Sequence, residues 1–191
     1  MAFVKGKAGN STTDKVYTPS KISKLIIDKF PLNGKVLDAF KGKGSFYDNY
    51  PDNVEKDWCE IDEGKDFFEY NEHVDWIITN PPFLAKNKMS KELKEKYKKY
   101  LVDCNDLYEI YIKQIINSEC LGGILILPSN FLFSFNNKLR KDFICKYEIK
   151  TLKIYEKQIF NDTTISIIVF DFQIRNQRNN NLNNFKINTV L

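Results

Sequence analysis

Apolar residues along this chain fall into two kinds of run, short continuous ones and longer ones with helical spacing. The short runs predict strands at 35–38, 58–61, 76–79, 124–127, 151–155 and 165–172. The helical spacing predicts helices that begin near Ser20, over 105–118 and around 136–146. Strands that alternate with helices favour an α/β fold with a doubly wound, mostly parallel sheet. The run at 165–172 alternates, which indicates a C-terminal antiparallel hairpin strand.

The composition fits one folded domain with less regular ends. With 191 residues, of which 42% are hydrophobic and 14% aromatic, the chain can bury one core. We expect a flexible lead-in at 1–15, the folded domain at 16–174 and a loosely ordered, Asn-rich tail at 175–191. Met1–Asn10 lacks the apolar core of a signal peptide, and no apolar stretch approaches membrane-spanning length. These features predict a cytoplasmic protein that does not bind a membrane.

The cysteines and the histidine argue against a metal site. The four cysteines are far apart and form no CxxC pair, and His73 is the only histidine. A zinc site needs several such ligands at short spacing, so we expect no bound metal. Reduced, mostly buried thiols in a reducing compartment are the expectation instead.

A glycine-containing loop follows the strand predicted at 35–38. The loop reads F-x-G-x-G-x-F from Phe40 to Phe46, with glycines at Gly42 and Gly44. Glycines directly after a strand let a ligand approach the backbone closely. Asp38, at the tip of the strand, could bind a cationic ammonium group. The same pattern also fits an ordinary strand–loop–helix turn.

Acidic residues follow the second predicted strand. Glu60 lies 22 residues after Asp38, where an acid in a doubly wound sheet can bind ribose hydroxyls. Asp62 competes for this role, but we interpret it as a solvated turn residue. Asp66 could accept the amino hydrogens of an adenine ring that Phe67 flanks. A helix start with a core phenylalanine explains this last pair equally well.

The segment Asn80-Pro81-Pro82-Phe83 follows the short apolar run at 76–78. Prolines stop a strand and fix φ, so the backbone here is stiff. Stiffness suits a backbone carbonyl and a side-chain amide that must point at one atom of a substrate. The aromatic residue then offers a flat face for a planar ring. A structural turn is the alternative interpretation.

The order of these segments resembles the gamma class of DNA adenine-N6 methyltransferases. The segments that carry the resemblance are Tyr17-Thr18-Pro19, the loop from Phe40 to Phe46, Cys59–Asp62, Asp66-Phe67 and Asn80–Phe83. Two later segments, 122–132 and 159–170, are similar to the family's strand-five and late hairpin motifs. The resemblance spans residues 15–172 and implies a Rossmann-like fold that binds S-adenosylmethionine and acts on DNA.

The resemblance also implies roles for individual residues. The implied catalytic residues are Asn80, Pro81, Pro82 and Phe83. The implied cofactor-binding residues are Tyr17, Thr18, Pro19, Asp38, Phe40, Gly42, Gly44, Glu60, Ile61, Asp66, Phe67 and Asn80. Phe160 matches an aromatic residue that contacts the target base, and Phe83 would stack on the same base.

Lysines are concentrated directly after the catalytic segment, with only Glu92 and Glu95 opposing them: Lys86, Lys88, Lys91, Lys94, Lys96, Lys98 and Lys99. As a helix this segment would be basic nearly all round. A charge run is often no more than a solvated face. Its place beside the expected base pocket favours phosphate contacts, for which Lys86, Lys88, Lys94 and Lys98 are the candidates. The net charge of +4 is compatible with a nucleic-acid partner.

Two features depart from the resembled family. Lys41 and Lys43 stand where small residues are usual in the cofactor loop. Relatives that recognise a defined duplex sequence carry a separate target-recognition domain after the hairpin, and here only the Asn-rich tail follows. Specificity is therefore relaxed, read by short loops, or supplied by a homodimer or a partner subunit.

Three other functions fit parts of the same pattern. An RNA methyltransferase acting on adenine N6 or guanine N2 would share Asn-Pro-Pro-Phe, but Tyr17-Thr18-Pro19 favours DNA. A cofactor-binding partner subunit of a heteromeric methyltransferase would explain the missing recognition domain. A protein-glutamine methyltransferase ranks lower, because such enzymes resemble Asn-Pro-Pro-Tyr instead.

Overall fold

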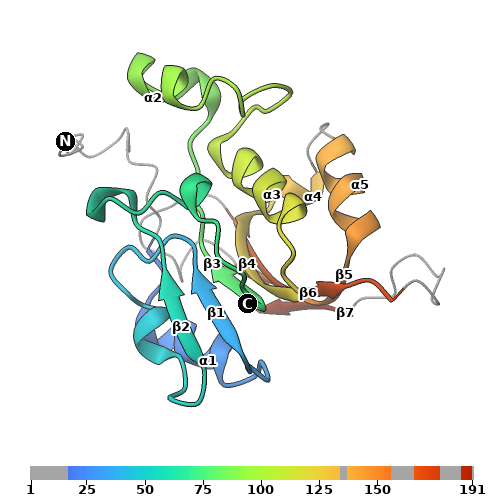
Figure 1. The fold of residues 1–191 in the computed structure, drawn as a ribbon. Coiled ribbons are helices and arrows are strands. Elements are labelled where there is room, and N and C mark those ends of the chain that lie inside the picture. The colour runs from blue at the N-terminus through green and yellow to red at the C-terminus, as the bar shows by residue number, and fades with distance from the viewer. Residues whose placement is uncertain (1–16, 134–136, 156–165, 177–185, 191) are drawn as a thin grey trace.

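The computed structural model describes residues 17–133, 137–155, 166–176 and 186–190, and Figure 1 shows their arrangement. Within these ranges the strands form one seven-stranded sheet. The strands are β1 (Lys35–Asp38), β2 (Glu55–Trp58), β3 (Trp76–Thr79), β4 (Gly122–Pro128), β5 (Tyr147–Tyr155), β6 (Ile167–Ile174) and β7 (Lys186–Val190). The α-helices are α1 (Ser20–Ile27), α2 (Lys91–Lys96), α3 (Leu107–Asn117), α4 (Asn130–Phe133) and α5 (Asn137–Lys146).

The strand order is β2-β1-β3-β4-β6-β5-β7. The first four of these strands pair in parallel, while β6 runs antiparallel between β4 and β5. This mixed sheet confirms the predicted α/β class and the antiparallel strand near the C-terminus. After β1 the chain crosses to β2 on one side and then returns to β3 on the other. Ligands in doubly wound sheets bind at such a reversal, outside the carboxyl ends of the strands.

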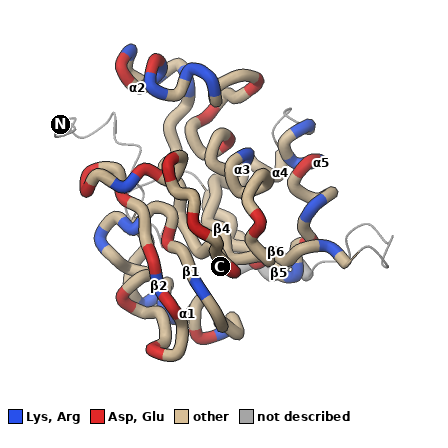
Figure 2. Tube along the Cα trace, viewed as in Figure 1, with Lys and Arg blue, Asp and Glu red and all other residues tan. Residues whose placement is uncertain are grey.

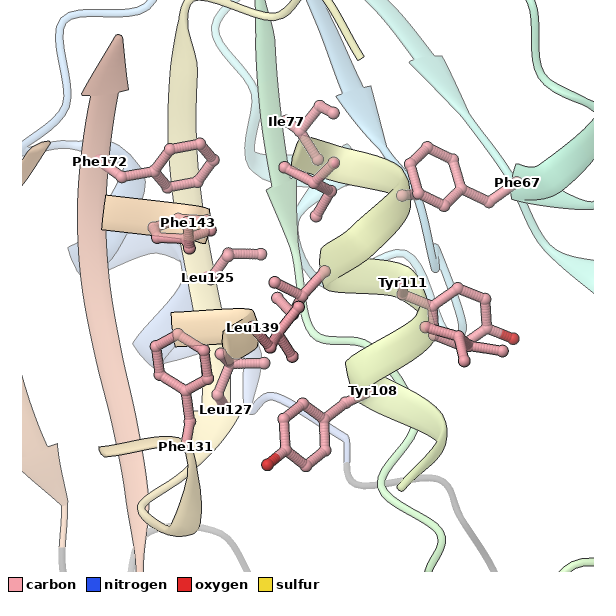
Figure 3. Packing of buried hydrophobic residues seen from close by; sticks show 14 of the residues in the cluster. Phe67, Ile77, Tyr108, Tyr111, Leu125, Leu127, Phe131, Leu139, Phe143 and Phe172 are labelled. Carbon is pink, nitrogen blue, oxygen red and sulfur yellow. The ribbon is translucent and has the colours of Figure 1, made fainter. Parts of the chain in front are cut away.

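Both faces of the sheet are covered, because side chains alternate between the faces along each strand. Ile77 of β3 belongs to the core under α3 and α5, and Figure 3 shows it in the same cluster as Leu125 and Phe143. The neighbouring Trp76 and Ile78 belong to the core on the opposite face, which α1 covers. All three strand residues are buried. Burial on both faces explains why the parallel strands read as continuous apolar runs.

The second strand lies three residues earlier than the sequence predicted, at Glu55–Trp58 instead of 58–61. Within the described part of the sheet β2 is an edge strand, paired only with β1. Glu55 and Lys56 are exposed and Asp57 and Trp58 are half-buried, so charged residues interrupt the apolar run by which a strand is recognised. Cys59 follows the strand and still contacts the end of β1, since its N–H donates to the Asp38 carbonyl oxygen at 2.8 Å.

Two other segments differ from the sequence analysis. The lysine-rich segment is helical only in part, at Lys91–Lys96, and it is not basic nearly all round, because Leu93 is half-buried and Tyr97 is buried. Ser90 caps the N-terminus of α2, and its Oγ accepts a hydrogen bond from the Leu93 N–H at 3.1 Å. The tail at 175–191 is not loosely ordered throughout, since Lys186–Val190 form β7 and pair in parallel with β5. Backbone pairing with an exposed strand edge needs little apolar sequence, so composition did not reveal it.

Three of the four cysteines, Cys59, Cys104 and Cys120, are buried as free thiols, and Cys145 is exposed. The described residues hold no group of three or more His, Cys, Asp or Glu side chains that could bind a metal ion. In the same part of the chain, no helix combines the length and the apolar character that a membrane span requires.

Candidate active site

A cavity of about 860 Å³ lies at the carboxyl ends of β1, β2 and β3. Its volume is within the range of about 300–1,000 Å³ that is typical of small-molecule sites. Ten of the residues predicted from sequence line it: Tyr17, Thr18, Phe40, Gly42, Glu60, Ile61, Asp66, Phe67, Asn80 and Pro82. The predicted residues Pro19, Asp38, Gly44, Pro81 and Phe83 do not line it.

The glycine loop forms one wall of this cavity. Gly42 has a φ of +52°, a conformation that side-chain-bearing residues rarely adopt. A Cβ atom at this position would lie 3.4 Å from the Tyr17 ring, an ordinary van der Waals contact, so it is the backbone conformation that favours glycine. Glycine therefore leaves the backbone open to a ligand here. The loop is tied to the second strand, because the Gly42 N–H donates to Glu60 Oε2 at 2.8 Å.

Asp38 lies beneath this loop instead of facing the cavity, so the expectation that it binds an ammonium group has no direct support. The side chain is only 1% exposed. Its Oδ1 accepts a hydrogen bond from the Phe40 N–H at 3.3 Å, which fixes the start of the loop. Burial in the protein interior raises the pKa of Asp38 to about 7.

The raised pKa of Asp38 predicts a measurable pH dependence of stability. Between about pH 4 and pH 7 the native carboxyl holds a proton that the unfolded chain has lost. Stability from this group is therefore complete below about pH 4 and falls as the pH rises, by up to about 1.4 kcal/mol per pH unit. Urea unfolding of wild type and Asp38→Asn at several pH values isolates the effect, because other groups titrate in both proteins. The wild type should lose stability relative to the variant over this window, and parallel curves would contradict the assignment.

The residues after the second strand form the adjoining wall, next to the glycine loop. Glu60 is 9% exposed, and its carboxylate also accepts from the Asp62 N–H at 3.4 Å. Asp62, which we interpreted as a solvated turn residue, is exposed but lines the cavity as well. Two carboxylates thus lie where the ribose of an adenosyl ligand is expected. Phe67 is buried and packs edge-on against Phe40, with ring centroids 5.8 Å apart.

Asp66 is already engaged by protein groups. Its Oδ1 accepts from the Phe68 N–H at 3.1 Å. Its Oδ2 lies 2.8 Å from the Lys96 ammonium of α2 and 3.4 Å from the Tyr97 hydroxyl. An adenine amino group that binds Asp66 would therefore do so beside Lys96 and Tyr97, which already contact the same carboxylate.

The contribution of the α2 segment to the cavity was not predicted from the sequence. The segment supplies Ser90, Glu92, Leu93, Lys96 and Tyr97 to the wall. Leu93 and Tyr97 are four residues apart, so they lie on the same side of the helix. This apolar pair within a lysine run was the one available signal that the segment has a buried face. The other cavity residues not predicted are Ala39, Lys41, Lys43, Ser45, Phe46, Lys65, Leu107 and Tyr111.

The Asn-Pro-Pro-Phe segment leaves the end of β3 at the edge of the cavity. The Asn80 Nδ2 donates a hydrogen bond to Thr18 Oγ1 at 3.2 Å. Pro81 is buried, whereas Phe83 is half-buried and meets Tyr108 edge-on at 6.2 Å between ring centroids. Two backbone contacts anchor the end of the segment, because Asp106 Oδ1 accepts from the Leu84 N–H at 3.0 Å and the Leu84 carbonyl accepts from the Leu107 N–H at 2.9 Å.

The candidate phosphate-binding lysines differ in their surroundings. Lys86 donates to the Leu101 carbonyl oxygen at 3.0 Å, so it also holds the segment together. Lys98 lies 3.4 Å from Glu95, and both side chains are well exposed. Lys88 is exposed and Lys94 is half-buried. Figure 2 shows lysines along α2 and the turn that follows it. Phe160 lies outside the described residues.

The fold and this cavity are those of an α/β domain that binds a nucleotide-like cofactor at the carboxyl ends of its parallel strands. Residues 11–160 match the family described as Eco57I restriction-modification methylase. Because this match covers most of the chain, the chain belongs to that family. A comparison with curated protein sequences gives no match.

Solved structures with the same fold include several bacterial methyltransferases. A methyltransferase subunit of a type I restriction-modification system from Streptococcus thermophilus is 17% identical with a TM-score of 0.59, covering 88% of this chain and 46% of that one. A chain described as a modification subunit of a putative type I restriction enzyme from Vibrio vulnificus YJ016 is 13% identical with a TM-score of 0.61, covering 84% and 44%. This chain thus covers less than half the length of either protein.

A chain from Listeria monocytogenes, described as a putative class I S-adenosylmethionine-dependent methyltransferase, is 11% identical. Its TM-score is 0.67, and the match covers 91% of this chain and 65% of that one. Fold and family together identify S-adenosylmethionine as the cofactor. The cavity fits this group, since an open glycine loop, two carboxylates and an aromatic pair surround a volume of suitable size.

Proposed function

We propose that this chain is a DNA methyltransferase that transfers a methyl group from S-adenosylmethionine to adenine N6. The observation that carries the proposal is the position of Asn80. Its amide lies on the cofactor cavity, at the start of a segment that two prolines stiffen and that contacts with Asp106 and Leu107 anchor. Family membership supports the reaction class and the substrate polymer.

The chemical problem is the weak nucleophilicity of adenine N6, whose lone pair is delocalised into the ring. S-adenosylmethionine supplies an electrophilic methyl group when it is bound. The Asn80 side-chain oxygen and the Pro81 carbonyl oxygen accept hydrogen bonds from the two N6–H groups. These hydrogen bonds favour a tetrahedral nitrogen whose lone pair points toward the methyl group. The same oxygens stabilise the positive charge that develops on N6. Positioning and preorganised acceptors thus supply the catalysis, with no special pKa required.

The target base must leave the duplex to reach Asn80. Phe83 is the aromatic residue that stacks on it, because it follows the acceptors directly and is only half-buried. Its edge-on contact with Tyr108 fixes the orientation of its ring. Phe83 lies outside the cofactor cavity, as a residue that contacts the base and not the cofactor should.

Lysines near α2 are expected to contact DNA phosphates. Lys86 donates to the Leu101 carbonyl, Lys96 pairs with Asp66 and Lys98 pairs with Glu95. The variant therefore tests three other lysines of the segment, Lys88, Lys94 and Lys99. Replacing these three lysines by alanine should make the slope of log K against log salt concentration shallower by up to about 0.9 for each phosphate that is no longer neutralised. Fluorescence anisotropy with a labelled duplex at several salt concentrations measures the slope.

A matched variant with Lys138, Lys141 and Lys150 replaced by alanine controls for this experiment. It carries the same net charge as the α2 variant and should keep the wild-type slope. Equal slopes in both variants would mean that the α2 lysines do not contact DNA phosphates and only form a solvated face.

A partner subunit, or a second copy of this chain, is expected to supply target recognition. Two of the similar structures are subunits of type I restriction-modification enzymes, and this chain covers less than half of each. The described residues form one sheet with its helices and include no separate recognition domain.

The proposed function is tested by transfer of a labelled methyl group to matched duplex DNA, single-stranded DNA and RNA. Label on DNA alone supports the proposal, and the preferred form of DNA defines strandedness. Label only on RNA would assign the chain to the RNA methyltransferases. If the cofactor binds but no polymer is labelled, a required partner subunit is missing, and adding lysate fractions from the source cell should restore transfer.

A further inference from the structure

We propose that Thr18 is a positioning residue that sets the orientation of the Asn80 amide for catalysis. The inference deepens the proposed function and rests on it. The contact that carries it is the hydrogen bond from Asn80 Nδ2 to Thr18 Oγ1, 3.2 Å long. The two residues are 62 positions apart in the sequence, so the tertiary fold alone brings them together.

An asparagine amide needs such a partner, because its two ends have nearly the same shape but opposite roles. The oxygen accepts hydrogen bonds, whereas the nitrogen only donates them. A half-turn of the amide would present the donor to adenine N6 and would repel its hydrogens. In the structure the Thr18 hydroxyl accepts from Nδ2, so the carbonyl end of the amide points away from Thr18 and the hydrogen bond holds the side chain in this position. Only that end can serve as the acceptor in the proposed reaction.

Thr18 is well placed to act in this way. It is 6% exposed, so water competes little for the hydrogen bond. The next residue, Pro19, directly precedes α1, and its carbonyl oxygen accepts from the Ile22 and Ser23 N–H groups at 2.8 and 3.1 Å. Ser23 in turn donates to the Ser45 carbonyl at the end of the glycine loop. Thr18 therefore sits on a segment fixed to both α1 and the cofactor loop.

Thr18 also lines the cavity, so a direct contact with the cofactor is the competing role. The two roles differ in what they change. A positioning residue affects the rate of transfer when cofactor and DNA are saturating, whereas a cofactor contact affects the binding of the cofactor.

Thr18→Val and Thr18→Ser separate these roles, because valine keeps the branched shape without the hydroxyl and serine keeps the hydroxyl. For Thr18→Val we expect kcat to fall about tenfold or more while the Kd of S-adenosylhomocysteine, measured by calorimetry, changes less than about threefold. Thr18→Ser should restore kcat to within about threefold of wild type. If valine misfolds, as thermal unfolding would show, Thr18→Ala provides the same comparison with less crowding.

A wild-type kcat in Thr18→Val and Thr18→Ala would overturn the inference. So would a loss confined to S-adenosylhomocysteine binding, which would make Thr18 a cofactor contact. Failure of the proposed function is a different result, because the wild-type enzyme would then not methylate adenine in DNA at all. The same variants could still be compared on whichever substrate the wild type accepts.

Discussion

Replacement of Asn80 by alanine is expected to lower kcat for methyl transfer by roughly a hundredfold or more, while the Kd of S-adenosylmethionine changes less than about threefold. Alanine removes the side-chain acceptor that polarises adenine N6. The stiff backbone of the following prolines remains, and so do the glycine loop and Glu60, which form the cofactor walls. Single-turnover kinetics with saturating cofactor measures the chemical step separately from binding and release.

Asn117→Ala is the matched control for this experiment. Asn117 ends α3, is exposed and does not line the cavity, so its replacement should leave both kcat and cofactor binding at wild-type values. Full turnover in Asn80→Ala would show that the assigned acceptor is not used. Equal losses in kcat and in cofactor affinity would instead indicate that Asn80 serves the cofactor.

Replacement of Glu60 by alanine is expected to weaken S-adenosylmethionine binding by about tenfold or more, equivalent to about 1.4 kcal/mol. Two effects combine in this variant. The Gly42 N–H loses its acceptor at 2.8 Å, so the glycine loop loses one of its contacts with the residues that follow the second strand. The carboxylate expected to accept from the ribose hydroxyls is also removed. Calorimetric titration with S-adenosylhomocysteine measures the change without turnover.

Glu60→Gln separates the loss of the hydrogen bond from Gly42 from the loss of the carboxylate charge. The amide oxygen can still accept from Gly42, but the charge is absent, so binding should be intermediate between wild type and Glu60→Ala. Glu63→Gln tests whether any acid near the loop has the same effect, because Glu63 pairs with Lys41 and does not line the cavity. If Glu60→Ala bound the cofactor as tightly as the wild type, Glu60 would have no role in this site.

The elements that were predicted best from the sequence are those whose residues are buried on every side or along one regular face. β1 and β3 lie at the predicted residues because both faces of each strand are covered, which forces a continuous apolar run. The helix predicted over 105–118 is α3 at Leu107–Asn117, and its apolar spacing matches one packed side. The edge strand β2 carries charges, and β7 depends on pairing with β5, so neither produced a clear apolar pattern.

The same distinction applies to the site. Residues directly after β1, β2 and β3 were predictable, since the carboxyl ends of parallel strands meet on one edge of the sheet. The α2 wall was not, because contacts such as Lys96 with Asp66 depend on how a later segment folds back over the cavity. The burial of Asp38 under its loop was hidden for a similar reason. Its position at a strand tip was evident, but the direction of its side chain was not.

The most direct test of the central claim is the identity of the methylated nucleoside. Duplex DNA is incubated with the protein and S-adenosylmethionine that carries a deuterated methyl group, then digested and examined by mass spectrometry. We predict deuterium-labelled N6-methyl-2′-deoxyadenosine with the wild type and none with Asn80→Ala. Label on cytosine, or label on adenine that persists in Asn80→Ala, would contradict the account.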